Sequence, residues 1–273
     1  MQESHPEYHQ LKIPVPQEFE NVFTYFYYAE NRSSGPVTKT LLPSYQTIML
    51  FCFGDSAFMT THEKNTVEVH QCIILGPVRQ TFEYTLPAGT SILVANFKDD
   101  AFYRFFGKAV VAAHGTHPNE ILHDNCFTEL WQQISALPSP EEKTAHILEF
   151  CRPYLQDQDE IIRLLSNFND DTLNPVKTIA EQTRRSERTI QQKQKEQLGY
   201  SAKEMIRYTR FLKTIKLIEK ELEHQKKIEW FNIIDECGYY DQSQLIHDFK
   251  HFINLSPSQY LKFQSDICRS GSD

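Results

Sequence analysis

Short apolar runs, interrupted by glycine and proline, fill the first third of the chain. The runs at 47–55, 66–77 and 80–97 are rich in β-branched and aromatic residues, a composition typical of β-strands. The third run contains the turn sequence Pro-Ala-Gly at 87–89, which predicts a hairpin. Several short strands at this spacing indicate a small barrel or sandwich.

From about residue 119 the apolar positions follow helical spacing instead. A helix is expected to begin after Ser139, because Pro140 suits the first helical position and Glu142 completes a capping box. The stripe before it has more apolar surface than one short helix pair needs, so we expect it to contribute to a dimer contact or, alternatively, to dock on the barrel. This stripe consists of Ile121, Leu122, Phe127, Leu130, Trp131 and Ile134.

A polar stretch at 167–174, with three Asp or Asn residues in a row, predicts a linker. The expected fold class is therefore α+β with two domains. We place a β-barrel in residues 1–117, a helical connector in residues 118–168 and an all-helical domain in residues 169–273.

An internal repeat occupies the helical domain, since residues 176–206 and 230–261 superpose at an offset of 54 to 55 residues. In the second copy Gly238 breaks the helical pattern, which predicts a left-handed helix end followed by a cap at Asp241 or Ser243. Such a pair of helices is a helix-turn-helix, whose second helix is a common means of entering the DNA major groove. An amphipathic helix over 206–222 joins the two copies.

The two copies share their ends as well as their apolar positions. Ile190 of the first copy corresponds to Leu245 of the second, and both are expected in the core. Each copy finishes with a left-handed residue and a new capping box. These ends are Gly199, Ser201 and Glu204 in the first copy, and Asn254, Ser256 and Gln259 in the second.

The segments IAEQTRRSERTIQQ (179–192), LGYSAKEMIRYTRFLKTIKLI (198–218) and CGYYDQSQLIHDFKHFINLSPSQY (237–260) together resemble the AraC/XylS family of bacterial transcription regulators. The resemblance covers roughly residues 174–264 and implies two helix-turn-helix subdomains that read successive major-groove faces. The chain departs from the family pattern at Gln192, Gln194, Gln244 and His247, where other residues are usual. These departures bear on which DNA sequence is recognised, not on the class of protein.

Contacts to DNA are expected from the start and the exposed positions of each second helix, because Arg reads guanine edges, Gln reads adenine, and Lys and Ser mostly meet phosphates. Ser186 is expected to cap the first of these helices. The expected contact residues are Arg184, Arg185, Ser186, Glu187, Arg188, Thr189, Gln191, Gln192 and Lys195 in the first unit, and Tyr240, Asp241, Gln242, Ser243, Gln244, His247 and Lys250 in the second.

The first hundred residues resemble, more weakly, the cupin-like β-barrel that some members of this family carry, through segments such as YFYYAEN and ILGPVRQTFEYTLPAG. In the family such a domain typically senses a small molecule or mediates dimerisation. The resemblance implies double-stranded DNA as a partner, a small-molecule effector, a homodimer and RNA polymerase as a further partner. The many aromatic residues of this region are interpreted as core, and no ligand contacts are named.

Charge and cysteine usage fit this interpretation. The net charge is −8, which argues against non-specific coating of nucleic acid, but residues 174–264 carry 11 Lys and 5 Arg against 12 acidic residues. The excess of positive charge indicates that the C-terminal part meets a polyanion. Six cysteines without a CxxC pair, no basic and apolar leader and no run of ~20 apolar residues predict a cytoplasmic protein with reduced thiols and no membrane partner.

An enzyme is the alternative that a cupin barrel raises, because many cupins hold a metal. His62, Glu63, Glu68 and His70 lie in the β region without a His-x-His pair, so they are interpreted as surface residues. No Ser/His/Asp set or Gly-rich phosphate loop is found, and no cysteine has the neighbouring Pro and His of a repair methyltransferase. We therefore expect no catalytic residue, metal or cofactor. An effector-independent regulator acting through protein contacts stays open, as does a cupin-type metal enzyme.

Overall fold

The computed structural model describes residues 7–61, 64–112, 114–168, 170, 173–224 and 228–262. Its contacts divide the chain into two compact units, Met1–Tyr200 and Ser201–Asp273. The expected boundary at residue 168 does not coincide with this division. The first helix-turn-helix belongs to the same unit as the strands, and the three-part division of the chain stays a prediction.

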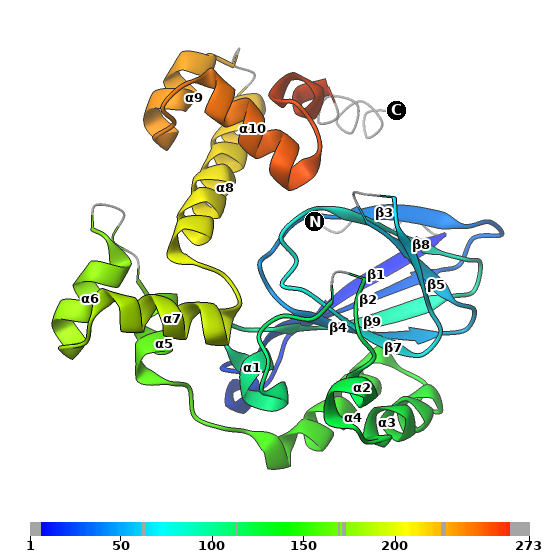
Figure 1. Cartoon of the computed structure of the whole chain (residues 1–273). Helices are drawn as coiled ribbons and strands as arrows, with labels where there is room; N and C mark the ends of the chain where they lie inside the picture. The colour runs from blue at the N-terminus through cyan, green and yellow to red at the C-terminus, as the bar shows by residue number, and fades with distance from the viewer. Residues whose placement is uncertain are drawn as a thin grey trace. The chain divides into compact units, whose positions relative to one another are not determined.

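Antiparallel strands of the first unit form two sheets (Figure 1). The five-stranded sheet has the order β1-β2-β9-β4-β7, and the four-stranded sheet has the order β3-β8-β5-β6. This strand-rich part, followed by helices, confirms the α+β fold class. The strands are β1 Tyr8–Ile13, β2 Phe23–Asn31, β3 Val37–Leu41, β4 Ile48–Phe53, β5 Ala57–Thr60, β6 Thr66–Val69, β7 Cys72–Leu75, β8 Phe82–Leu86 and β9 Ser91–Phe97.

The hairpin predicted at 87–89 is wrong. β8 pairs with β3 and β5, whereas β9 pairs with β2 and β4 in the other sheet, so the turn carries the chain from one sheet to the other. Gly89 donates its N–H to the carbonyl of Asn31 at this corner, at 2.8 Å. The run at 66–77 likewise divides into β6 and β7, one in each sheet. Strand propensity is the same on both sides of such a corner, so it does not show which partner each strand takes.

The five-stranded sheet is the middle layer of the first unit, and neighbouring residues of β4 and β9 point to opposite sides of it. Leu50 and Ile92 belong to the core between the two sheets. Phe51 and Leu93 belong to a second core, formed with the helices that cover the outer face (Figure 1). Most of the aromatic residues at 19–28 and 97–106 are buried in this second core, as expected.

Local side-chain contacts fix where several helices of the first unit begin and end. Ser139 accepts the N–H of Glu142 at 3.2 Å and thereby confirms the predicted start. The stripe over 119–137 divides into two helices, because His123 has φ 55° and the Asn119 side chain accepts the N–H of Phe127. These helices are α1 Ala101–Phe106, α2 Pro118–Leu122, α3 Cys126–Ser135, α4 Pro140–Cys151, α5 Glu160–Ser166, α6 Pro175–Thr183 and α7 Glu187–Leu198, with 3-10 turns at Gln17–Phe19 and Arg152–Tyr154.

The apolar stripe expected to support dimerisation is largely covered within the chain itself. Leu130 and Ile134 are fully buried against the sheet, and the indole N–H of Trp131 donates to the carbonyl of Cys52 at 2.7 Å. The stripe therefore follows the alternative interpretation, docking on the barrel. Homodimerisation stays a prediction, without the surface that motivated it.

The second unit consists of α8 Ala202–Glu223, α9 Trp230–Cys237, α10 Gln242–Ile253 and a helical turn at 257–262. Ser201 and Glu204 form the predicted capping box at the start of α8. Ser256 and Gln259 do the same before the last turn, since each backbone N–H donates to the other side chain. Across the described residues, no helix combines the length and apolar character required to cross a membrane.

Candidate nucleic-acid interface

The first helix-turn-helix consists of α6 and α7. α6 ends at Arg184, which has φ 54°, and Ser186 Oγ accepts the N–H of Thr189 at 3.1 Å to start α7. Ile179 of α6 and Ile190 of α7 are fully buried and hold the two helices together. The predicted cap and the predicted core contact are both confirmed.

The second helix-turn-helix consists of α9 and α10 and uses the same local chemistry. Gly238 ends α9 with φ 73°, as predicted. Asp241, rather than Ser243, caps α10 by accepting the N–H of Gln244 at 2.8 Å. The Gln244 side chain returns the bond by accepting the N–H of Tyr240, also at 2.8 Å. Gln244 is therefore part of the turn, and its amide oxygen is already engaged.

The second helices of the two copies match in length and in how they end. α7 and α10 each have 12 residues and end at a left-handed residue, Gly199 with φ 79° and Asn254 with φ 58°. Leu245 is buried as Ile190 is. The repeat found in the sequence is thus a repeat of helix-turn-helix structure.

Each second helix leaves the candidate contact residues at the surface. In the second unit only Gln244 is partly buried, and Tyr240 is 91 % exposed. The exposed residues are Arg184, Arg185, Ser186, Glu187, Arg188, Thr189, Gln191, Gln192 and Lys195 in the first unit, and Tyr240, Asp241, Gln242, Ser243, His247 and Lys250 in the second. That these residues contact DNA stays a proposal.

α7 is also attached to the part of its own unit that precedes α6. Lys193 pairs with Asp159 of the α5 cap, and the hydroxyl of Tyr103 donates to Glu196 at 3.4 Å. At the end of the helix, the Arg79 guanidinium donates to the carbonyl of Gly199. These contacts tie α7 to the preceding part of the unit.

A buried carboxylate, which the sequence did not single out, fixes α10 to α8. Asp248 is 1 % exposed and accepts hydrogen bonds from Arg207 Nε at 2.5 Å and Arg210 Nη2 at 2.7 Å. A second nitrogen of Arg207 contacts His247 Nδ1 at 2.9 Å. The sequence did contain a signal for this contact, since Asp248 is an acidic residue inside the apolar stripe of α10. An acidic residue is almost never buried without a partner, so a basic partner could have been expected.

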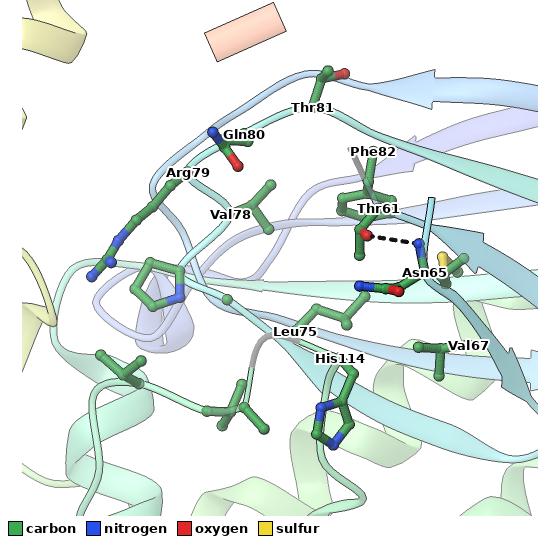
Figure 2. Close-up of a pocket in the computed structure, with 16 residues that line it drawn as sticks. Thr61, Asn65, Val67, Leu75, Val78, Arg79, Gln80, Thr81, Phe82 and His114 are labelled. Atoms are coloured by element: carbon green, nitrogen blue, oxygen red, sulfur yellow. Dashed lines mark hydrogen bonds between the residues drawn. The ribbon is translucent and has the colours of Figure 1, made fainter. Parts of the chain in front are cut away.

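A cavity of about 380 Å³ lies at one end of the barrel (Figure 2). Its apolar wall includes Met59, Leu75, Val78 and Phe82, and the segment 110–112 closes one side. Among the lining residues that the structure describes, Arg79 is the single permanently charged one; its backbone is at the edge of the cavity and its guanidinium points away from the other labelled residues (Figure 2).

The residues of the metal-enzyme alternative do not form a site in the part of the chain that is described. On the surface, His70 Nε2 lies 3.8 Å from Glu68 Oε2, and His70 Nδ1 contacts the hydroxyl of Ser56. His62 and Glu63 are outside the described residues. No group of three or more His, Cys, Asp or Glu able to hold a metal occurs among the residues described.

The cysteines that the structure describes are free thiols, and Cys268 lies outside this part. Cys237 is buried at the second turn. Burial raises the pKa of Cys52 to about 11, so this thiol stays protonated at neutral pH.

Comparison with protein families decides the nature of the repeat, because residues 179–262 match the family model of a helix-turn-helix domain. This segment is a helix-turn-helix domain of the AraC type. Comparison with curated proteins gives no match. A domain of this type supports a role as a DNA-binding regulator.

Among solved structures, the chain is similar to ToxT from Vibrio cholerae, with 17 % identity, a TM-score of 0.42 and coverage of 86 % of this chain and 97 % of that one. A fatty-acid-bound ToxT structure shows 14 % identity, a TM-score of 0.37 and coverage of 96 % and 97 %. An rmlC-like cupin protein from Desulfovibrio desulfuricans shows 7 % identity and a TM-score of 0.26 over 36 % of this chain and 88 % of that one. At such low similarity, the function has to be argued from the residues of this chain.

Proposed function

We propose that this protein is a sequence-specific transcription regulator that binds duplex DNA through α7 and α10. The observation that carries the proposal is the pair of equal helices, each held by buried residues on one side and exposing polar residues on the other. A helix presented in this way fits the width of the major groove. The match of residues 179–262 to a helix-turn-helix domain supports the same function.

Within α7, the proposed base-reading residues are Arg188, Gln191 and Gln192. All three side chains are exposed, and no hydrogen bond or ion pair to another described residue engages them. Arg pairs with the two acceptors of guanine, and Gln pairs with adenine. Lys195 and Lys250, at exposed positions further along the two helices, are proposed to contact phosphates.

Selection from a pool of random duplex oligonucleotides tests this proposal with the full chain. We expect a defined site with a dissociation constant on the order of 10⁻⁸ M or tighter, and an affinity that falls steeply with salt. Arg188→Ala is expected to lower the affinity and relax one base position. Lys12→Ala, which removes one positive charge from β1, is the matched control. Failure of the folded wild-type protein to select any sequence contradicts the proposal.

We further infer that a small organic acid bound in the barrel cavity controls the regulator. The volume of about 380 Å³ falls within the range of small-molecule sites, ~300–1,000 Å³. An apolar wall with one guanidinium at its edge suits a ligand with an apolar body and a carboxylate. Structures of ToxT contain an unsaturated fatty acid or a naphthalenyl-butenoic acid, whereas the proposal for this chain rests on its own lining residues.

The cavity is connected to α7 by two contacts that meet at Gly199. Arg79 donates to the Gly199 carbonyl, and the segment that closes the cavity packs against the same residue through Ala109 and Val110. A carboxylate that takes Arg79 as its partner competes with the Gly199 carbonyl. Binding is therefore expected to loosen the end of α7.

Melting of the full chain with a series of aliphatic and aromatic carboxylic acids tests the effector site. Acids are expected to raise the melting temperature and their methyl esters are not, because the ester lacks the charge that pairs with Arg79. Arg79→Gln should remove the rise in melting temperature. Arg32→Gln, just after β2 of the five-stranded sheet, should retain it. No shift with any acid favours an effector-independent regulator and leaves the DNA proposal standing.

A further inference from the structure

His247 lies on the exposed side of α10, beside a pair of arginines from α8. Its Nδ1 is 2.9 Å from Arg207 Nη2. Arg207 Nε is bonded at the same time to Asp248 Oδ1, at 2.5 Å. One guanidinium therefore holds both the buried carboxylate and the exposed imidazole.

The chemistry of arginine fixes the proton on the other ring nitrogen of the imidazole. A guanidinium has five N–H donors, no acceptor, and does not lose its proton in proteins. The contact can be a hydrogen bond only if Arg207 donates and His247 Nδ1 accepts. A neutral imidazole whose Nδ1 accepts carries its proton on Nε2, so His247 presents an N–H donor.

We propose that Arg207 holds His247 in the neutral tautomer whose Nε2–H donates a hydrogen bond to guanine in the major groove. This assignment rests on the proposed DNA-binding function. Guanine offers two adjacent acceptors, O6 and N7, to such a donor. Adenine places its own amino donor next to N7, and cytosine offers only a donor at this edge. The order of preference at this position is therefore guanine first and cytosine last.

The remaining contacts keep the guanidinium in place. Asp248 is buried, and its second carboxylate oxygen accepts from Arg210 Nη2 at 2.7 Å, so the carboxylate is held from two sides. The Arg207 guanidinium also lies 5.3 Å from the centre of the Phe252 ring. Arg207 is accordingly a positioning residue, which acts on DNA through His247.

Nitrogen-15 NMR of the histidine rings tests the tautomer in the free full-length protein. We expect the His247 signals, identified by their loss in His247→Gln, to show a protonated Nε2 and an unprotonated Nδ1. Arg207→Met should bring the His247 ring to the mixture of the two neutral tautomers that exposed histidines show. A wild-type ring that is protonated on Nδ1 overturns the assignment whether or not the protein binds DNA.

Binding to the selected site, with each of the four base pairs placed in turn at every position, tests the base preference. Wild type should prefer guanine over cytosine at one position by about five- to tenfold, the effect of one hydrogen bond. His247→Ala should remove this preference, and His247→Asn should shift it towards adenine, which pairs with an amide.

Arg210→Met is the matched control for Arg207→Met, because both variants lose one charge and one bond to Asp248 but only Arg207 contacts His247. Arg207→Met should flatten the preference at the His247 position, whereas Arg210→Met should keep it even if the affinity falls. Equal flattening by both variants, or no change of any preference in His247→Ala, overturns the inference. A wild-type protein that selects no sequence at all contradicts the proposed function, and the tautomer measurement still tests the geometry.

Discussion

The glycines that end α7 and α9 offer the same substitution in two different surroundings. Both have a left-handed backbone, with φ 79° at Gly199 and φ 73° at Gly238. A Cβ at Gly238 meets no atom within 4 Å. A Cβ at Gly199 lies 2.9 Å from the carbonyl oxygen of Ala109 and 2.9 Å from Val110 Cγ2. Both distances are far inside van der Waals contact, and one of the atoms is backbone.

These distances predict unequal losses of folding free energy. Gly238→Ala costs roughly 1–2 kcal/mol, the price of a left-handed residue that has a side chain. Gly199→Ala carries the same cost and must also displace the segment at 109–110, for which overpacking adds about 1–3 kcal/mol. We expect Gly199→Ala to destabilise the protein by about 2–5 kcal/mol, clearly more than Gly238→Ala.

Urea unfolding followed by circular dichroism measures both losses, and asparagine separates their causes. Asparagine accepts the left-handed backbone with little strain, so Gly238→Asn should be nearly neutral, whereas Gly199→Asn retains the clash. Equal losses at the two positions, for alanine and for asparagine, would refute the packing of α7 against the segment at 109–110.

Three further predictions concern a charge, a pH dependence and the salt dependence of binding. Asp248→Asn should cost about 2–4 kcal/mol in urea unfolding, since it leaves two arginines near a buried neutral group, whereas exposed Asp235→Asn should change stability by less than ~0.5 kcal/mol. Burial lowers the pKa of His117 below its ordinary value of 6.5, so its contribution to stability is lost as the pH falls from 6.5 through the folded-state pKa. His117→Asn, which can still cap α2, should show a smaller loss of stability between pH 7 and pH 5, and an unchanged loss would exclude His117 as the cause. In binding titrations against salt, Arg188→Ala should cost roughly 1–3 kcal/mol of binding free energy and relax the preference for one base. Gln244→Ala should leave the slope of log affinity against log salt nearly unchanged. The reason is that ten basic and three acidic residues lie between Arg184 and Lys216, whereas five basic and eight acidic ones lie between Leu217 and Gln264. A flatter slope for Gln244→Ala, with no effect of Arg188→Ala, would reverse these roles.

Local interactions could be predicted from the sequence because the residues that make them are close along the chain. The caps at Ser186, Ser201 and Ser256 each join a side chain to a backbone N–H three residues away. The left-handed ends at Gly199 and Gly238 likewise depend on one residue and its neighbours. Two copies of the same pattern then identified the helix-turn-helix units, whereas the contact side of each second helix stays a prediction.

Contacts between residues far apart in the chain could not be predicted in this way. Arg207 and Asp248 are 41 positions apart, and Arg79 and Gly199 are 120 apart. Neither pair has a spacing that a helix or strand period would mark. The sheet to which β8 and β9 belong is similarly set by partners elsewhere in the chain. The sequence thus predicted which residues face outward, and the structure shows what holds them there.

The contacts of α7 connect the barrel to the proposed DNA interface within one unit. Lys193 and Glu196 of α7, and Gly199 at its C-terminal cap, each contact the part of the unit that precedes α6. Arg188, Gln191 and Gln192 occupy exposed positions of the same helix. If release of the Gly199 end, as proposed above, shifts α7 as one body, the residues proposed to read bases are expected to move with it. A signal from the cavity therefore needs no path through the second unit to alter binding by the first.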